Sequence, residues 1–190
     1  TLPVAALGSF LLDVRHDPKP RELAFDFLMQ IDPTAARSLQ AGMLNDPSME
    51  LRRGAIQKLA DHVHKFEDIG AVCASGSFKA DGMIIAPCSI KTMSEIATGV
   101  TNSLMSRAAD VMLKEKRKLV LMVRETPLHS LHLRNMANLS DAGAFIMPPV
   151  VTLYQRPKTI DDMINHIIGR ALDHFDIEAG LVKRWKGLKQ

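Results

Sequence analysis

The stretch GMIIAPCSIKT, residues 82–92, decides the fold of most of this chain. Its first part, Gly82–Pro87, is a short apolar run bounded by glycine and proline, which is typical of a strand covered on both faces of a parallel sheet. Its second part leads into a helix that we predict over Thr92–Lys116, with a break near Gly99. The stretch therefore predicts the first half of a βαβ unit.

Two further apolar runs alternate with helical patterns along the rest of the chain. The runs are Lys118–Val123 and Ala144–Met147, and the helical patterns cover Ser130–Ala142 and Ile160–Phe175. This alternation predicts a three-layer α/β fold in which helices flank a parallel sheet. In such sheets ligands bind beyond the carboxyl ends of the strands, so site residues are expected directly after each run.

Residues 1–66 follow a different pattern. Asp-Pro pairs at 17–18, 32–33 and 46–47 each open a stretch with helical apolar spacing, and Asp followed by Pro is favourable at a helix start. We predict three short helices, of which the third, at 46–60, weakly resembles a HEAT-repeat helix. Ordinary amphipathic helices are the simpler interpretation, because a solenoid needs about three repeats. The predicted domains are 1–66, an atypical helical segment, and 67–190, the α/β domain.

Composition excludes several classes of protein. The chain has 190 residues, 46% hydrophobic and 24% charged, which is typical of a soluble globular protein, and no apolar run is long enough to span a membrane. The net charge of +3 arises in residues 67–190, which is too little for a nucleic-acid surface but enough for one anion pocket. Cys73 and Cys88 lack metal-ligand spacing, and a reducing cytoplasmic setting is the simplest expectation.

Polar residues follow the first two predicted strands. Ser89–Thr92 offers hydroxyl groups, a lysine and a helix start, a combination that suits a flavin or its phosphate; the alternative is a serine N-cap with nothing bound. After the second strand, Arg124 could hold a phosphate and Glu125 could transfer a proton. The alternative for this pair is a structural ion pair.

Five further side chains are candidates with plain alternatives. Tyr154 follows the third strand and could bind a phosphate oxygen, or could lie at a core edge. Arg107 and Lys114 are about two helical turns apart on one face, which is usually a solvated face. Arg170 near a helix end could interact with the helix dipole, and Trp185 could be a packing anchor.

Taken together, the motifs resemble the UbiX-type flavin prenyltransferase family from residue 67 to about 187, in the family's order and spacing. They are SGSFKADGMIIAPCSIKTMSEIATG (75–99), RAADVMLKEKRKLVLMVRETPLH (107–129), HLRNM (132–136), GAFIMPP (143–149), RPKTIDDMINHIIGR (156–170) and RW (184–185). The resemblance implies a fold related to flavin-binding decarboxylases, and dodecamers with active sites between subunits. It also implies a metal-independent transferase that joins dimethylallyl phosphate, or the pyrophosphate, to reduced FMN. The product, prenylated FMN, would serve a UbiD-type decarboxylase in ubiquinone biosynthesis or aromatic acid decarboxylation.

The resemblance also implies roles for individual residues. Flavin contacts would come from Ser89, Ile90, Lys91 and Thr92, with Arg124 binding FMN. Glu125 would be the catalytic residue that handles protons. The prenyl phosphate would be held by Arg107, Lys114, Tyr154 and Arg170, some of them from a neighbouring subunit, and Trp185 would help to close the pocket.

The chain departs from the family at its start. The family's first strand and Gly-rich FMN-phosphate turn are not recognisable, and Gly8-Ser9 is the nearest string. We therefore expect Met83–Ala86 to lose a strand neighbour and FMN affinity to fall. Two other functions stay open: a flavin-dependent decarboxylase of the same fold, and a non-catalytic interaction module whose helical front binds a partner.

Overall fold

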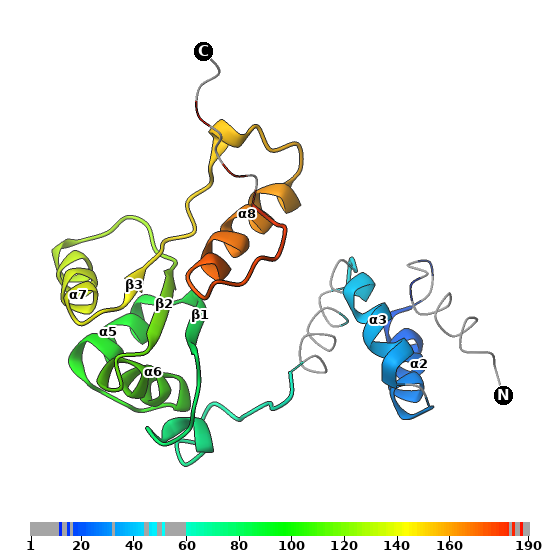
Figure 1. Cartoon of the computed structure of the whole chain (residues 1–190), viewed down its shortest axis with the longest axis horizontal. Coiled ribbons are helices and arrows are strands. Elements are labelled where there is room, and N and C mark those ends of the chain that lie inside the picture. Colours follow the sequence, from blue (N-terminus) through cyan, green and yellow to red (C-terminus); the bar gives the residue numbers. More distant parts are fainter. Residues whose placement is uncertain are drawn as a thin grey trace. The chain divides into compact units, whose positions relative to one another are not determined.

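The computed structural model describes residues 12, 15, 17–31, 33–43, 46–48, 51, 60–182, 184 and 187. The chain groups into two compact units, residues 1–63 and 64–190 (Figure 1). None of the helices within the described ranges is both long and apolar enough to cross a membrane.

In the first unit, two helices start at the prolines that the sequence indicated. They are α2, Pro18–Ile31, and α3, Pro33–Met43, and their shared core contains Phe25, Ala36, Met43 and Leu51. A buried ion pair joins Arg21 to Asp46, whose other carboxylate oxygen accepts from the Ser48 N–H at 2.9 Å. The first two predicted helices are confirmed, whereas most of the third, 46–60, lies outside the described residues.

The second unit alternates strands and helices, as the sequence predicted. Its strands are β1, Gly82–Cys88, β2, Lys118–Val123, and β3, Phe145–Ile146. Its α-helices are α5, Ile90–Thr98, α6, Leu104–Lys114, α7, Ser130–Asp141, and α8, Ile160–Asp173. Two short 3₁₀ helices are η1, Val72–Ala74, and η2, Leu153–Gln155.

Local signals explain where these helices begin and end. Ser103 and Thr159 each form a capping box that starts α6 and α8. The predicted break near Gly99 is confirmed, because Gly99 adopts the left-handed conformation (φ 71°) that ends α5.

The three strands form a parallel sheet in the order β1-β2-β3. Ile84 of β1 lies opposite Val120 of β2, and Val120 in turn lies opposite Phe145 of β3. Within the described residues β1 pairs only with β2, so it forms an edge, as expected from the unrecognised first strand of the family. The strand predicted over Ala144–Met147 is shorter than expected, since only two residues have strand geometry.

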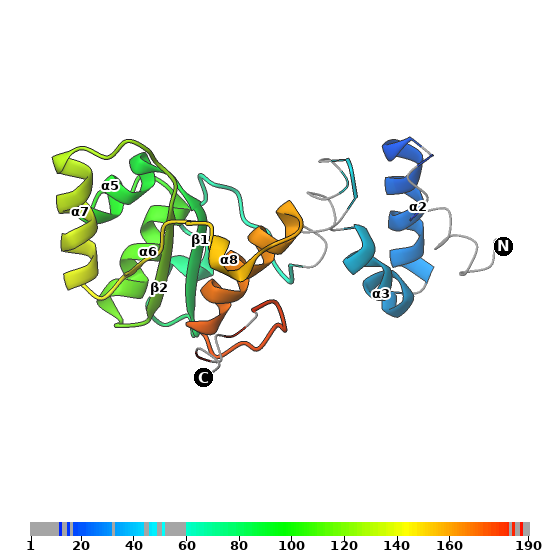
Figure 2. The same cartoon turned by 90° about the horizontal axis from the view of Figure 1, so that it is seen from above.

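Helices cover both faces of the sheet, which gives the predicted three layers. Figure 2 shows β1 and β2 between α8 on one side and α5, α6 and α7 on the other. The face toward α5, α6 and α7 holds a core of twelve buried residues that includes Leu119, Leu121 and Val123. The face toward α8 holds three buried members among the described residues, Val120, Met122 and Ala171. Alternate residues of β2 therefore point to opposite faces, as strand geometry requires.

Candidate active site

A cavity of about 310 Å³ opens beyond the ends of β2 and β3. It is lined by Val123, Arg124, Glu125, Thr126 and Pro149. The Arg124 N–H donates to the Cys88 carbonyl oxygen at 3.0 Å, which ties the end of β2 to the end of β1. The end of β1 and the residues that follow β2 and β3 therefore lie at one edge of the sheet, as expected for parallel strands.

Arg124 and Glu125 are both exposed, and neither forms an ion pair with the other or with any described residue. The Glu125 carboxylate accepts only from the neighbouring Thr126 N–H, at 3.2 Å. The structural ion pair that was the alternative interpretation is therefore not found in the described part of the chain. Both charges remain available to a ligand in the cavity.

The turn between β1 and α5 has the geometry of a helix cap. The Ser89 hydroxyl accepts from the Thr92 N–H at 3.2 Å and lies 3.1 Å from the Thr92 hydroxyl. Lys91 is largely exposed, with its ammonium 3.6 Å from the Glu95 carboxylate. Ser89 is therefore the N-cap of α5, and the turn lies beside Arg124 because of the hydrogen bond to Cys88.

Tyr154 and Arg170 lie away from that cavity within one chain. Tyr154 belongs to η2 and is 65% exposed. Arg170 donates to Asp173 at 2.6 Å, and Asp173 also accepts from Arg184 at 3.0 Å. These charges line a separate depression together with Glu178, which also binds Arg184.

Asp173 is the centre of this charge cluster. Hydrogen bonds from Arg184 and then Arg170 hold the pKa of its carboxyl below the usual value, because both guanidinium groups favour the charged form. The Arg170 side chain is half-exposed, so its pairing with Asp173 leaves part of the guanidinium open to solvent.

Arg107 and Lys114 also lie apart from the cavity at the strand ends. Arg107 donates to Asp110 at 3.2 Å, and Lys114 donates to Glu115 at 2.9 Å. The Lys114 ammonium lowers the pKa of the Glu115 carboxyl. Both cations are about half-exposed, in agreement with the solvated-face interpretation for a single chain.

One chain thus brings together two of the predicted groups, the Arg124-Glu125 pair and the Ser89–Thr92 turn. It does not bring Arg107, Lys114 or Arg170 into the same cavity. Trp185 and the Gly8-Ser9 string lie outside the described residues. Pro149, which the sequence analysis named only within the GAFIMPP motif, forms one wall of the cavity.

No three His, Cys, Asp or Glu side chains within the described ranges come together as a metal site.

A parallel sheet between helical layers, with charged residues beyond its strand ends, defines a flavoprotein-type α/β domain. The Flavoprotein family model matches residues 23–172, and so reaches into the segment that the quoted motifs do not cover. Among curated relatives, the flavin prenyltransferase UbiX of Thauera aromatica is 54% identical over 132 residues, which is 70% of this chain and 68% of that protein. A probable UbiX-like flavin prenyltransferase of Sedimentibacter hydroxybenzoicus is 51% identical over 140 residues, 74% of each chain. This chain belongs to the UbiX-type flavin prenyltransferase family.

Solved structures agree with this assignment. The crystal structure of AnUbiX (PadA1) in complex with FMN and dimethylallyl pyrophosphate has a TM-score of 0.71 and 40% identity, and covers 88% of this chain and 92% of that one. A dodecameric FMN-dependent UbiX-like decarboxylase from Escherichia coli O157:H7 has a TM-score of 0.68 and 44% identity. The match covers 82% of this chain and 80% of that one.

Proposed function

We propose that this protein transfers a dimethylallyl group from dimethylallyl phosphate or pyrophosphate to reduced FMN. The observation that carries the proposal is that Arg124 and Glu125 line one cavity at the strand ends, and that neither forms an ion pair with a described residue. An arginine fork suits a phosphate or a flavin carbonyl, and a carboxyl group beside it suits proton transfer. Prenyl transfer needs both kinds of group within one cavity.

The cavity and its surroundings fit a flavin as the acceptor. Arg124 and the Ser89–Thr92 turn would hold FMN, since they present a guanidinium, hydroxyl groups and a helix start at one sheet edge. Reduced FMN, when bound, would supply N5 and C6 as the nucleophilic acceptors of the dimethylallyl group. Glu125 would accept the proton that the flavin releases, or protonate the leaving phosphate.

The donor phosphate needs cations that one chain does not place in this cavity. As the carbon–oxygen bond to the phosphate breaks, the phosphate leaves with the electron pair, and positive side chains stabilise that charge. We assign this task to Arg107, Lys114 and Arg170, whose half-exposed side chains can reach a site on a neighbouring copy. The exposed hydroxyl of Tyr154 would add a hydrogen bond to the phosphate. The catalytic form is therefore a homo-oligomer, and the reaction proceeds without a metal ion.

We also propose that a UbiD-type decarboxylase in the cytoplasm uses the product, prenylated FMN. Ubiquinone biosynthesis and aromatic acid decarboxylation are the two settings that such a recipient serves. Prenylated FMN released to a separate enzyme would have to leave an open cavity, and the exposure of Arg124 and Glu125 supports that.

Flavin uptake is the first experiment. The full chain is mixed with FMN, passed through a desalting column and examined for bound visible absorbance. We expect retained flavin, with weaker affinity than in relatives that have a Gly-rich phosphate turn. Protein that stays colourless at millimolar FMN would defeat the proposal. The Arg124→Gln variant should retain less flavin, whereas Lys79→Gln, at an exposed site elsewhere, should match the wild type.

A flavin-dependent decarboxylase is the second candidate, because a phenylacrylic acid decarboxylase from Aquifex aeolicus shares the fold with a TM-score of 0.60 and 32% identity. The two functions differ in their co-substrate. Consumption of dimethylallyl phosphate by the protein with reduced FMN supports the transferase. Carbon dioxide release from an aromatic acid, without any prenyl donor, supports the decarboxylase.

A further inference from the structure

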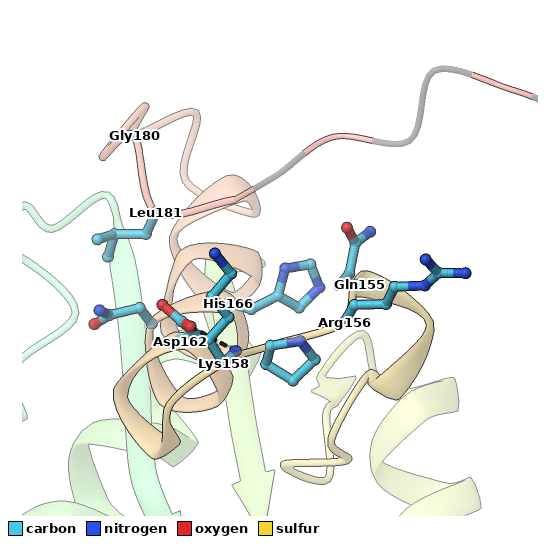
Figure 3. A pocket seen from close by; sticks show the side chains of 9 residues that line it. Gln155, Arg156, Lys158, Asp162, His166, Gly180 and Leu181 are labelled. Carbon is cyan, nitrogen blue, oxygen red and sulfur yellow. Dashed lines mark hydrogen bonds between the residues drawn. The ribbon is translucent and has the colours of Figure 1, made fainter.

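A second cavity, of about 380 Å³, lies between the start of α8 and the segment around residues 180–181. Figure 3 shows the side chains that surround it. Its lining consists of Gln155, Arg156, Pro157, Lys158, Asp162, Asn165, His166, Gly180 and Leu181. None of these residues lines the cavity of Arg124 and Glu125, and none belongs to the candidate active site.

His166 is the unusual member of this lining. It is 92% buried, since its relative exposure is 8%, yet it forms no hydrogen bond within the described part of the chain. Its ring nitrogens are not among the buried polar atoms that lack a partner in the described residues, so they keep access to the cavity and can bond to what fills it. In Figure 3 the ring lies among the side chains of Lys158, Gln155 and Arg156 and faces the cavity. A ligand in the cavity could therefore form a hydrogen bond with the ring.

The charges around His166 favour an anion. Arg156 and Lys158 are exposed cations on the segment that enters α8. The one carboxylate in the lining, Asp162, is already engaged, since it accepts from the Lys158 and Thr159 N–H groups at 2.8 and 3.0 Å. Those bonds hold the pKa of Asp162 below its usual value and offset part of its charge. The cavity is left with an excess of positive charge at a helix N-terminus.

The side of the cavity formed by residues 180–181 is apolar and packs closely on α8. The chain passes over α8 at Gly169, where an added Cβ would lie 2.5 Å from a Val182 methyl carbon and 3.0 Å from the Leu181 Cβ. This approach brings Leu181 against the helix one turn from His166, and Pro157 adds apolar surface to the same lining. The cavity volume exceeds what an inorganic anion alone would fill, and lies within the range of small-molecule sites.

We propose that Arg156, Lys158 and His166 form a second anion site on α8 that binds a phosphate group. Phosphate presents several acceptor oxygens, which match a guanidinium fork, an ammonium and an imidazole N–H at once. The group can belong to free phosphate, or to an organic phosphate whose short chain contacts Leu181 and Pro157. The site stands on these contacts alone and does not depend on the proposed prenyl transfer.

Histidine NMR on the full chain tests this site. The chain has seven histidines, and the His166→Gln variant identifies the His166 imidazole signal. Inorganic phosphate is added at constant ionic strength, with chloride as the matched salt. We expect the His166 signal to move saturably with phosphate and not with chloride. Butyl phosphate in a parallel titration separates the sources: tighter binding than phosphate indicates an organic ligand, and equal binding indicates free phosphate.

Exposed variants make the result decisive, because they do not disturb the core. Lys158→Gln removes one charge-assisted hydrogen bond and should weaken phosphate binding roughly tenfold. Arg156→Asn should do the same, and asparagine tolerates the left-handed backbone of that position (φ 51°). Lys79→Gln should bind as the wild type does, and Arg124→Gln should lose flavin affinity but keep the His166 shift. No saturable shift, or a shift unchanged in Lys158→Gln and Arg156→Asn, overturns the site.

Discussion

The two faces of the sheet are covered very differently. In the described part of the chain, three helices cover one face over a core of twelve buried residues, whereas α8 covers the other face over a core of three. The charged cluster around Asp173 and the cavity around His166 both belong to α8, on the thinly covered side. The closely packed face therefore supplies most of the stability of residues 64–190, and the strand ends and the α8 side carry the polar groups available for binding.

Glu125→Gln gives the largest expected effect, on activity and not on stability. The variant keeps the shape of the side chain but removes the proton-transferring carboxyl, so prenyl transfer should fall by roughly 10²–10⁴-fold. Flavin retention and the unfolding midpoint should not change, because the carboxylate is exposed and bonded only to Thr126. Unchanged turnover would remove Glu125 from the mechanism.

Leu121→Ala and Met122→Ala compare the two faces through adjacent residues. Leu121 is fully buried toward α5, α6 and α7, and Met122 is 4% exposed toward α8. We expect Leu121→Ala to lower the free energy of unfolding by about 3–4 kcal/mol and Met122→Ala by about 2 kcal/mol, since α8 can move to fill the space. Urea unfolding measures both, and an equal or larger loss for Met122→Ala would contradict the difference between the faces.

Gly169→Ala tests how tightly the C-terminal segment packs on α8. Alanine is the better helix former by about 1 kcal/mol, but its Cβ would overlap Val182 and Leu181. We expect a net loss of about 1 kcal/mol in unfolding free energy and a perturbed His166 signal. A gain in stability, as for an exposed helical glycine, would show that the segment does not pack there.

Acid unfolding should reveal the Asp173 cluster as a small effect. Because its folded pKa lies below the unfolded value, its contribution is present at neutral pH and is lost as the pH falls through that folded value. The wild-type urea midpoint should therefore fall more steeply than that of Asp173→Asn once the pH drops below about 4. If the urea midpoints of the two proteins changed with pH in the same way, the cluster would have no role in stability.

Much of the second unit is predictable because its signals are local. Lys118–Val123 was expected as a strand with those bounds, because an apolar run between charged residues has few other solutions. The placement of Arg124 and Glu125 beside the end of β1 followed from parallel pairing alone. The strand over Ala144–Met147 was overestimated, since its length depends on how far β2 extends as a partner.

The remaining features depend on contacts that sequence spacing does not encode. Arg170 was expected at the prenyl phosphate, yet within one chain it binds Asp173 together with Arg184 from the returning C-terminal segment. The cavity at His166 likewise forms only because that segment crosses α8 at Gly169. No motif around His166 signals its burial without a partner.

Single-turnover prenylation tests the proposed chemistry most directly. Reduced FMN and dimethylallyl phosphate are incubated anaerobically with the full chain, and the flavin is analysed by mass spectrometry. We predict a flavin heavier by one dimethylallyl-derived unit, formed by the wild type and by Lys79→Gln but not by Glu125→Gln. Bound FMN that emerges unmodified from the wild type, with the prenyl donor intact, would contradict the assignment of prenyl transfer to this protein.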